Sequence, residues 1–280
     1  MRMRPAAVSP LRRARAMAAL AAVVLAIVAA AATPPPSSAS SVPEDPRAAF
    51  ERIQQEASGA DERTEATMTL LDAGGSRHAR AAIFLQKTLA AGRTARRIEF
   101  RSPPEMEGCS LLAIENEERG PDWWIYLPAY HTTRRIASAD RGETYMGTDY
   151  SYEDLTDLRA GDHAFAWIGE EMVDGVACRK LEVRPLALPA NEASLYSRKV
   201  YWVEKDRPVW RRALLYGRDG QERKEARNSE PVIAGGRARW NRTELRDLRS
   251  GHVTQIVVQN RRFDALPERL FTERSLRSSA

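Results

Sequence analysis

Three carboxylates and three tyrosines fall within residues 144–155, which read TYMGTDYSYEDL. Asp149 and Glu153 are four residues apart, so a helix would place both on one face, and Asp154 follows directly. Two carboxyl groups in different environments can divide the roles of general acid and general base. One hypothesis is therefore a cell-envelope hydrolase that uses Asp149 with Glu153 or Asp154.

A structural role explains the same residues without catalysis. Asp149 or Ser151 can cap a short helix over residues 151–158, and acidic residues in its first turn would suit the helix dipole. Leu155 and Leu158 would then face a sheet. On these grounds we favour capping and packing over catalysis.

The rest of the chain offers no motif for catalysis or for cofactor binding. It has no G-x-S-x-G, H-E-x-x-H or C-x-x-C motif and no Walker or G-x-G-x-x-G loop. His78, His131, His163 and His252 are scattered, with few other ligand-type residues beside them. We therefore expect a protein that is not an enzyme, with no cofactor and no metal.

The N-terminal segment has the pattern of a secretory signal peptide. Five arginines precede the apolar run 17–32, and small residues before a cleavage point follow, including Ser37 and Ala39. We expect a signal peptide over 1–39, a linker over 40–45 and a single domain over 46–280 in the periplasm. The alternative is an uncleaved inner-membrane anchor, although a run of about 16 residues is short for a span of about 20.

The same segment accounts for the basic character of the chain. The sequence has 43 basic and 38 acidic residues, and without the five N-terminal arginines the two counts are equal. A nucleic-acid partner would need a persistent basic patch, so we expect none.

Two cysteines follow the signal segment. In an oxidising compartment Cys109 and Cys178 can form a disulfide, which would stabilise the fold by roughly 4 kcal/mol for so long a loop. The alternative is that both are buried as small apolar residues. The sequence leaves this choice open.

Alternating apolar and polar residues predict a mostly β protein. A helix is expected over residues 45–57, where Ala49, Phe50, Ile53 and Ala57 share one face, and a short closing helix over 266–276. Strand patterns follow at 62–75, 77–88, 94–102, 108–117, 122–128, 132–137, 163–186, 194–228 and 237–262. This spacing predicts ten to twelve antiparallel strands, whose apolar face must close on itself, be covered by a helix or hold a greasy ligand.

If that face is a hydrophobic groove, its lining can be proposed from the strand patterns and the covering segments. Trp123 and Trp124 are adjacent, so they point to opposite faces of their strand. Our candidates for cavity or lid residues are Phe50, Ile53, Met68, Leu70, Ile83, Leu85, Ile98, Phe100, Trp124, Tyr126, Met146 and Tyr150.

Several segments in combination resemble the bacterial outer-membrane lipoprotein-sorting protein family of the LolA/LolB-like superfamily. They are DWWIYLPAYHTTRRI, GETYMGTDYSYEDL, GVACRKLEV and YWVEKDRPVWRRALLYGRDGQERKEAR. The resemblance runs over residues 60–275. It implies a large curved antiparallel sheet, an incomplete barrel, with a few short helices covering its open concave side.

The resemblance also implies a function. Members of the lipoprotein-sorting family are non-catalytic periplasmic carriers. They hold acyl chains of lipoproteins or lipids and move them towards the outer membrane, and some serve inner-membrane transporters. Helix 47–57 and the segment 144–155 are then the natural covers of the cavity. Two alternatives remain: the hydrolase above, and a β-rich assembly module that binds another protein by its edge strand.

Overall fold

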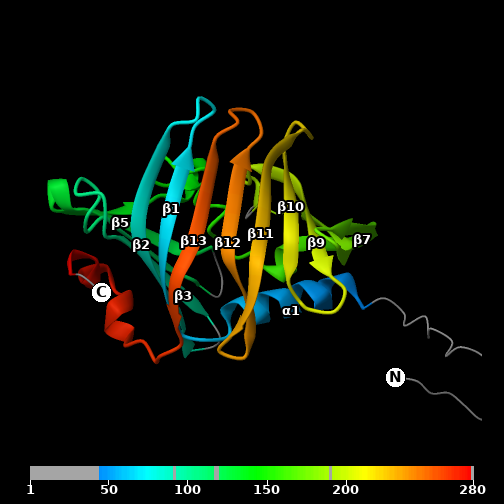
Figure 1. Ribbon diagram of the computed structural model, residues 1–280, viewed down its shortest axis with the longest axis horizontal. Helices are drawn as coiled ribbons and strands as arrows, with labels where there is room; N and C mark the ends of the chain where they lie inside the picture. The colour runs from blue at the N-terminus through cyan, green and yellow to red at the C-terminus, as the bar shows by residue number, and fades with distance from the viewer. Residues whose placement is uncertain (1–43, 91–92, 117–119, 189–190, 279–280) are drawn as a thin grey trace, which may run out of the picture. The chain divides into compact units, whose positions relative to one another are not determined.

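The chain forms one antiparallel β-sheet, shown in the computed structural model, which describes residues 44–90, 93–116, 120–188 and 191–278 (Figure 1). The sheet has 13 strands in the order β6-β5-β4-β3-β2-β1-β13-β12-β11-β10-β9-β8-β7. The expected signal peptide over 1–39 and most of the expected linker lie outside the described residues. The prediction of a mostly β chain with few helices is confirmed, and the strands slightly outnumber the ten to twelve expected.

The strands follow the sequence patterns closely. Their bounds are β1 Glu62–Leu71, β2 Arg77–Thr88, β3 Thr94–Phe100, β4 Ser110–Ile114, β5 Asp122–Leu127, β6 Thr132–Ile136, β7 His163–Val173, β8 Val176–Pro185, β9 Tyr196–Glu204, β10 Trp210–Gly217, β11 Glu222–Ala234, β12 Arg237–Asp247 and β13 Val253–Arg262. Tight turns join most neighbours; at Asp174-Gly175 both residues have positive φ, 49° and 77°, as a two-residue hairpin loop requires.

The first and last strands of the chain pair in the middle of the sheet. β1 lies between β2 and β13, with Met68 opposite both Arg80 and Ile256. The strands at the two ends of the order, β6 and β7, are edges, so the sheet does not close into a barrel. Residues far apart in sequence therefore share one inner surface.

One α-helix covers part of this surface. Helix α1 spans Pro46–Ser58, close to the predicted 45–57, and Asp45 caps it by accepting a hydrogen bond from the Ala48 amide at 3.0 Å. Its buried residues are Ala49, Phe50 and Ile53. The helix contacts β2, β7 and β12, and Figure 1 shows it crossing the lower ends of the strands. We call the covered surface the inner face.

The connection between β6 and β7 packs on the inner face as well. This crossing segment, residues 137–162, contains the 3₁₀ helices Ser138–Gly142 (η3) and Ala160–Asp162 (η4), with turns between them. The helix predicted over 151–158 is wrong. Ser151 and Asp154 bond each other's side chains and backbone at 2.8–3.2 Å, which closes a local turn in place of a helix.

Short C-terminal helices lie on the opposite, outer face. In place of the single helix predicted over 266–276, the structure has two 3₁₀ helices, Glu268–Phe271 (η6) and Glu273–Arg277 (η7). A further 3₁₀ helix, Pro128–Tyr130 (η2), follows β5 in the middle of the chain. Phe271 and Leu276 pack against Leu85, Leu112 and Tyr126. This half of the sheet is therefore buried on both faces. No helix in the described part of the chain is long and apolar enough to cross a membrane.

Cys109 and Cys178 do not form the disulfide that the sequence left open. Both thiols are free and buried. Cys109 belongs to the apolar cluster around Phe100 and Trp123, whereas Cys178 belongs to a separate cluster around Trp202 and Leu214. Burial also raises the pKa of each thiol, so neither is a reactive thiolate at neutral pH.

Candidate functional site

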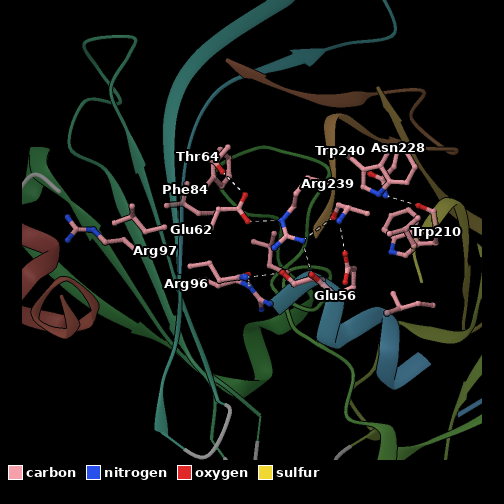
Figure 2. Close-up of a pocket in the computed structure, with 18 of the residues that line it drawn as sticks. Glu56, Glu62, Thr64, Phe84, Arg96, Arg97, Trp210, Asn228, Arg239 and Trp240 are labelled. Carbon is pink, nitrogen blue, oxygen red and sulfur yellow. Dashed lines mark hydrogen bonds and ion pairs between the residues drawn. The ribbon is translucent and has the colours of Figure 1, made fainter. Parts of the chain in front are cut away.

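A cavity of about 410 Å³ lies on the inner face beside the C-terminal half of α1 (Figure 2). It is lined mainly by apolar atoms from strands of both halves of the sheet, from α1 and from the crossing segment. The lining residues with apolar side chains include Ile53, Ala57, Phe84, Leu85, Ile98, Leu111, Trp123, Leu155, Val209, Trp210 and Trp240. The volume is within the range of about 300–1,000 Å³ that holds one small ligand.

The strand register explains why these side chains meet. Thr64 pairs with Phe84, Phe84 with Ile98, and Ile98 with Leu111, so the four form one row across β1 to β4. Paired residues of antiparallel strands project to the same face. On β5, Trp123 pairs with Ala113 and extends this wall. The row is therefore a continuous apolar strip on the inner face.

Charged side chains form one end of the cavity. Nε of Arg239 lies 2.7 Å from Oε2 of Glu62, and Nε of Arg261 lies 2.7 Å from Oε1 of the same carboxylate. Nη1 of Arg239 donates to the Glu56 carbonyl at 2.7 Å, at the end of α1. Nη2 of Arg239 is buried and has no hydrogen-bond partner among the described residues. Figure 2 shows Arg239 between Glu62 and Glu56 in the lining of the cavity.

A second charged group involves the crossing segment. Nη2 of Arg96 bonds Asp157 at 2.6 Å, and the Glu115 carboxylate accepts a hydrogen bond from the Thr94 amide at 2.8 Å. Burial, together with the hydrogen bond and the negative charge of Asp157, raises the pKa of Glu115 to about 7. These residues fix the crossing segment to the ends of β3 and β4.

Asp149 and Glu153 anchor the crossing segment at two further points. Oδ2 of Asp149 accepts hydrogen bonds from Thr254 Oγ1 and from His252 Nδ1, both at 2.7 Å. The Glu153 carboxylate accepts hydrogen bonds from Ser194 Oγ at 2.6 Å and from the Leu195 amide at 2.7 Å. The two carboxylates thus bind different strands and loops.

Asp154 is the anchor that pairs with a buried lysine. Its carboxylate accepts hydrogen bonds from Lys224 Nζ at 2.6 Å and from the Tyr196 hydroxyl at 2.7 Å. Burial acts to raise the pKa of Asp154, but Lys224, Lys199 and the hydrogen bonds outweigh it and hold the pKa below its usual range. An ionised, fully bonded carboxylate stabilises the segment; it lacks the raised pKa expected of a general acid.

The predicted site residues separate into three groups. Ile53 and Ile98 line the cavity; Leu85 also borders it, but its side chain packs in the outer-face cluster with Phe271 and Leu276. The second group lies on the inner face but packs in the protein core: Phe50 packs against Phe165 with the two rings tilted by 36°, Tyr150 packs near Tyr196, and Met68, Leu70, Phe100 and Met146 pack around Tyr145 and Tyr152. In this region the protein's own aromatic side chains fill the inner face.

Ile83, Trp124 and Tyr126 form the third group and correct the prediction. They belong to the outer-face cluster beneath η6 and η7, away from the inner-face row. The pattern misled because the sheet is apolar on both faces here, so alternation shows which residues share a face but not which face holds the cavity. Because Trp123 and Trp124 are adjacent, the sequence showed that they point to opposite faces of the sheet. Trp123 is the one that lines the cavity.

Sequence reasoning also missed the lining residues Phe84, Trp210 and Arg239. Phe84 alternates with Ile83 and Leu85, the residues that the strand pattern marks as its apolar face. Trp210 has a local signal, since it is an aromatic residue within the strand pattern 194–228. Arg239 had none, because a lone arginine in a strand of many charges does not mark a buried site. No group of three or more metal-ligating side chains occurs among the described residues.

The comparisons with known proteins match this architecture. A family model described as "Uncharacterized protein" matches residues 92–278. A DUF1329 family protein from Desulfovibrio piger is 27% identical, covers 83% of this chain and 99% of its own, and superposes with a TM-score of 0.77. No curated protein matches the chain.

Two further solved structures share the fold. An outer membrane lipoprotein-sorting protein domain from Vibrio parahaemolyticus is 21% identical, with a TM-score of 0.76, and the match covers 84% of this chain and 100% of that domain. A LolA superfamily protein from Nitrosomonas europaea is 17% identical, with a TM-score of 0.62, covering 81% and 97% of the two chains. At these identities the likeness shows the fold alone.

Proposed function

Because this chain belongs to the family of uncharacterized proteins whose model matches residues 92–278, and shares its fold with lipoprotein-sorting and LolA superfamily proteins, we propose that it is a non-catalytic carrier of acyl chains. The cargo is a lipoprotein or a lipid, and its hydrocarbon occupies the cavity on the inner face. The carrier works in the periplasm and delivers cargo towards the outer membrane.

The observation that carries this proposal is the unfilled apolar cavity on the inner face. An acyl chain moved from water into such a site gains about 0.8 kcal/mol per buried CH₂ group. Phe84, Ile98 and Leu111 supply a wall for it, and Ile53 and Leu155 supply the opposite cover. A folded chain gains nothing by leaving this volume empty, since interiors pack to high density.

The two covers are joined to each other. Nε2 of Gln54, on α1, donates a hydrogen bond to the Leu158 carbonyl of the crossing segment at 2.6 Å. The Asp149, Glu153 and Asp154 anchors hold the crossing segment on the sheet. Helix α1 is therefore the cover that has to move when a long chain enters, because fewer charged contacts fix it to the strands.

The cellular part of the proposal rests on the signal-like N-terminal segment. We expect cleavage after Ala39, export to the periplasm and, as a partner, an inner-membrane transporter that supplies the cargo. Fractionation of cells expressing the full chain, with N-terminal sequencing of the product, tests this directly. Recovery of a full-length product in the inner membrane would instead indicate a carrier that is anchored there.

The carrier activity itself is tested by lipid transfer between vesicles. Donor vesicles carry a fluorescent acyl lipid with a quencher, and acceptor vesicles carry neither, so transfer raises the fluorescence. The protein should accelerate transfer in proportion to its concentration. A rate equal to that of vesicles alone would overturn the proposed function.

A further inference from the structure

We propose that the cavity selects a single-chain amphiphile with an acidic head group, which Arg239 binds through Nη2. The inference rests on the proposed carrier function and adds the class of cargo. Arg239 is 8% exposed, lines the cavity and carries a buried nitrogen, Nη2, for which the described part of the chain supplies no hydrogen-bond partner. A buried donor of a charged group that lacks a partner is costly, so an anionic oxygen placed there is favoured.

The other donors of this guanidinium are already engaged. Nε faces Glu62, and Nη1 donates to the carbonyls of Glu56 and Ala238 at 2.7 and 3.0 Å. These contacts fix the plane of the group, so Nη2 keeps one position (Figure 2). A planar, fixed guanidinium recognises carboxylate and phosphate oxygens better than a flexible ammonium does.

The local charge balance also favours an anion. Arg237, Arg239 and Arg261 gather here against Glu56 and Glu62, which leaves one positive charge in excess. The Glu56 carboxylate is partly occupied, because it accepts a hydrogen bond from the Ala238 amide at 2.6 Å. An acidic head group would complete the neutralisation of this cluster.

The geometry places head and tail at opposite ends of the strip. Thr64 Oγ1 donates to Glu62 at 3.0 Å, so the charged cluster adjoins β1, where the row Thr64, Phe84, Ile98 and Leu111 begins. From β1 to β4 the row spans about 14 Å, three strand spacings. A cavity of about 410 Å³ is in the range for one small ligand, which argues for a single chain.

Displacement of fluorescent cis-parinaric acid from the purified protein tests the head-group preference. Competitors are oleic acid, lysophosphatidic acid and methyl oleate. We expect at least one acidic competitor to bind about tenfold more tightly than methyl oleate. Tighter binding of oleic acid assigns a free fatty acid, and tighter binding of lysophosphatidic acid assigns a lysophospholipid. Equal affinity of all three would overturn the inference and leave the carrier function standing; binding of none would overturn the function as well.

Two variants connect the preference to Arg239. R239Q should lower the affinity for the acid to that for the ester, and R239K should recover only part of it. R242Q is the matched control on the same strand: Arg242 pairs with Glu230 at 2.9 Å and does not line the cavity. Circular dichroism melting verifies that each variant is folded. If folded R239Q still preferred the acid as wild type does, Arg239 would not be the head-group ligand.

Discussion

At the scale of single residues, the acidic group that first suggests catalysis proves to hold the fold together. Asp154 and Lys224 form an ion pair at 2.6 Å, and each side chain is almost completely buried. Removing one partner of such a pair leaves an uncompensated charge in the interior. The Asp154 carboxylate is therefore a buried, charged anchor of the crossing segment, beside Asp149 and Glu153.

The first prediction follows from this pair. D154N should lower the free energy of unfolding by about 3 kcal/mol, because Lys224 keeps its charge and loses its counter-ion. Urea denaturation measures the change. E51Q is the control: Glu51 pairs with Arg47 on the exposed face of α1, and its loss should cost less than about 0.5 kcal/mol. Equal midpoints for D154N and wild type would contradict the anchoring role.

The second prediction concerns the pH dependence of stability. The pKa of Glu115 is raised to about 7, from burial and from Asp157, so the fold favours its protonated form. This contribution is full below the unfolded pKa of about 4.5 and is lost as pH rises through about 7. E115Q cannot ionise, and its amide oxygen can still accept the Thr94 hydrogen bond.

Melting temperatures at about pH 5 and about pH 8 measure this effect. The Tm of E115Q minus that of wild type should be larger at the higher pH than at the lower pH, since only wild type acquires the unfavourable charge as the pH rises. A constant difference between the two proteins across this range would show that Glu115 titrates normally.

Residue identities that depend on tertiary context were the hardest to predict. The sequence placed Trp123 and Trp124 on opposite faces, which is correct, but it chose the outer one for the cavity. Only the position of the C-terminal 3₁₀ helices decides which face is covered by protein. Likewise, Asp149 accepts hydrogen bonds from Thr254 and His252, and these two partners are about a hundred residues away in sequence.

At the scale of elements, helix α1 is the part whose prediction was most secure. Its cap, its proline at the first turn and its apolar face are all local signals, and each is present in the structure. The crossing segment was less predictable. Its capping residues were recognised, but they close turns over 151–156 because Ser151 and Asp154 bond locally and the segment packs on both halves of the sheet.

The third prediction tests α1 as the wall of the cavity. Ala57 is an exposed residue of α1 that lines the cavity. The A57W substitution therefore places an indole in the space for the acyl chain with little change to the core. Affinity for cis-parinaric acid should fall by about tenfold or more. Q55W is the matched control, since Gln55 is exposed on the same helix and does not line the cavity. Equal effects of both substitutions would place the ligand elsewhere.

At the scale of the whole molecule, the sheet is organised by the pairing of β1 with β13. Apart from β1 and β13, neighbouring strands of the sheet follow one another in sequence, as expected for strands joined by short turns. The β1–β13 pair joins the ends of the folded chain, and no local signal marks it. The resemblance to the lipoprotein-sorting family implied one large antiparallel sheet, and the structure confirms that fold, which the chain shares with the two solved structures described above.

The curvature of one open sheet, with covers on its inner face, is what creates a space between the two halves. Phe84 and Trp123 come from one half, Trp210 and Arg239 from the other, and all four line the same cavity. An all-β module that binds only by its edge strand would have no need of such a space. The cavity is therefore the feature of the whole molecule on which the proposed carrier function depends.

Native mass spectrometry of the purified chain with a mixture of fatty acids, lysophospholipids and neutral lipids tests this account most directly. We expect a one-to-one adduct with an acyl-chain amphiphile, absent in A57W and retained in Q55W. A wild-type spectrum that stays free of lipid at concentrations that saturate other carriers, or an adduct equally abundant in A57W, would contradict the claim that hydrocarbon occupies the inner-face cavity.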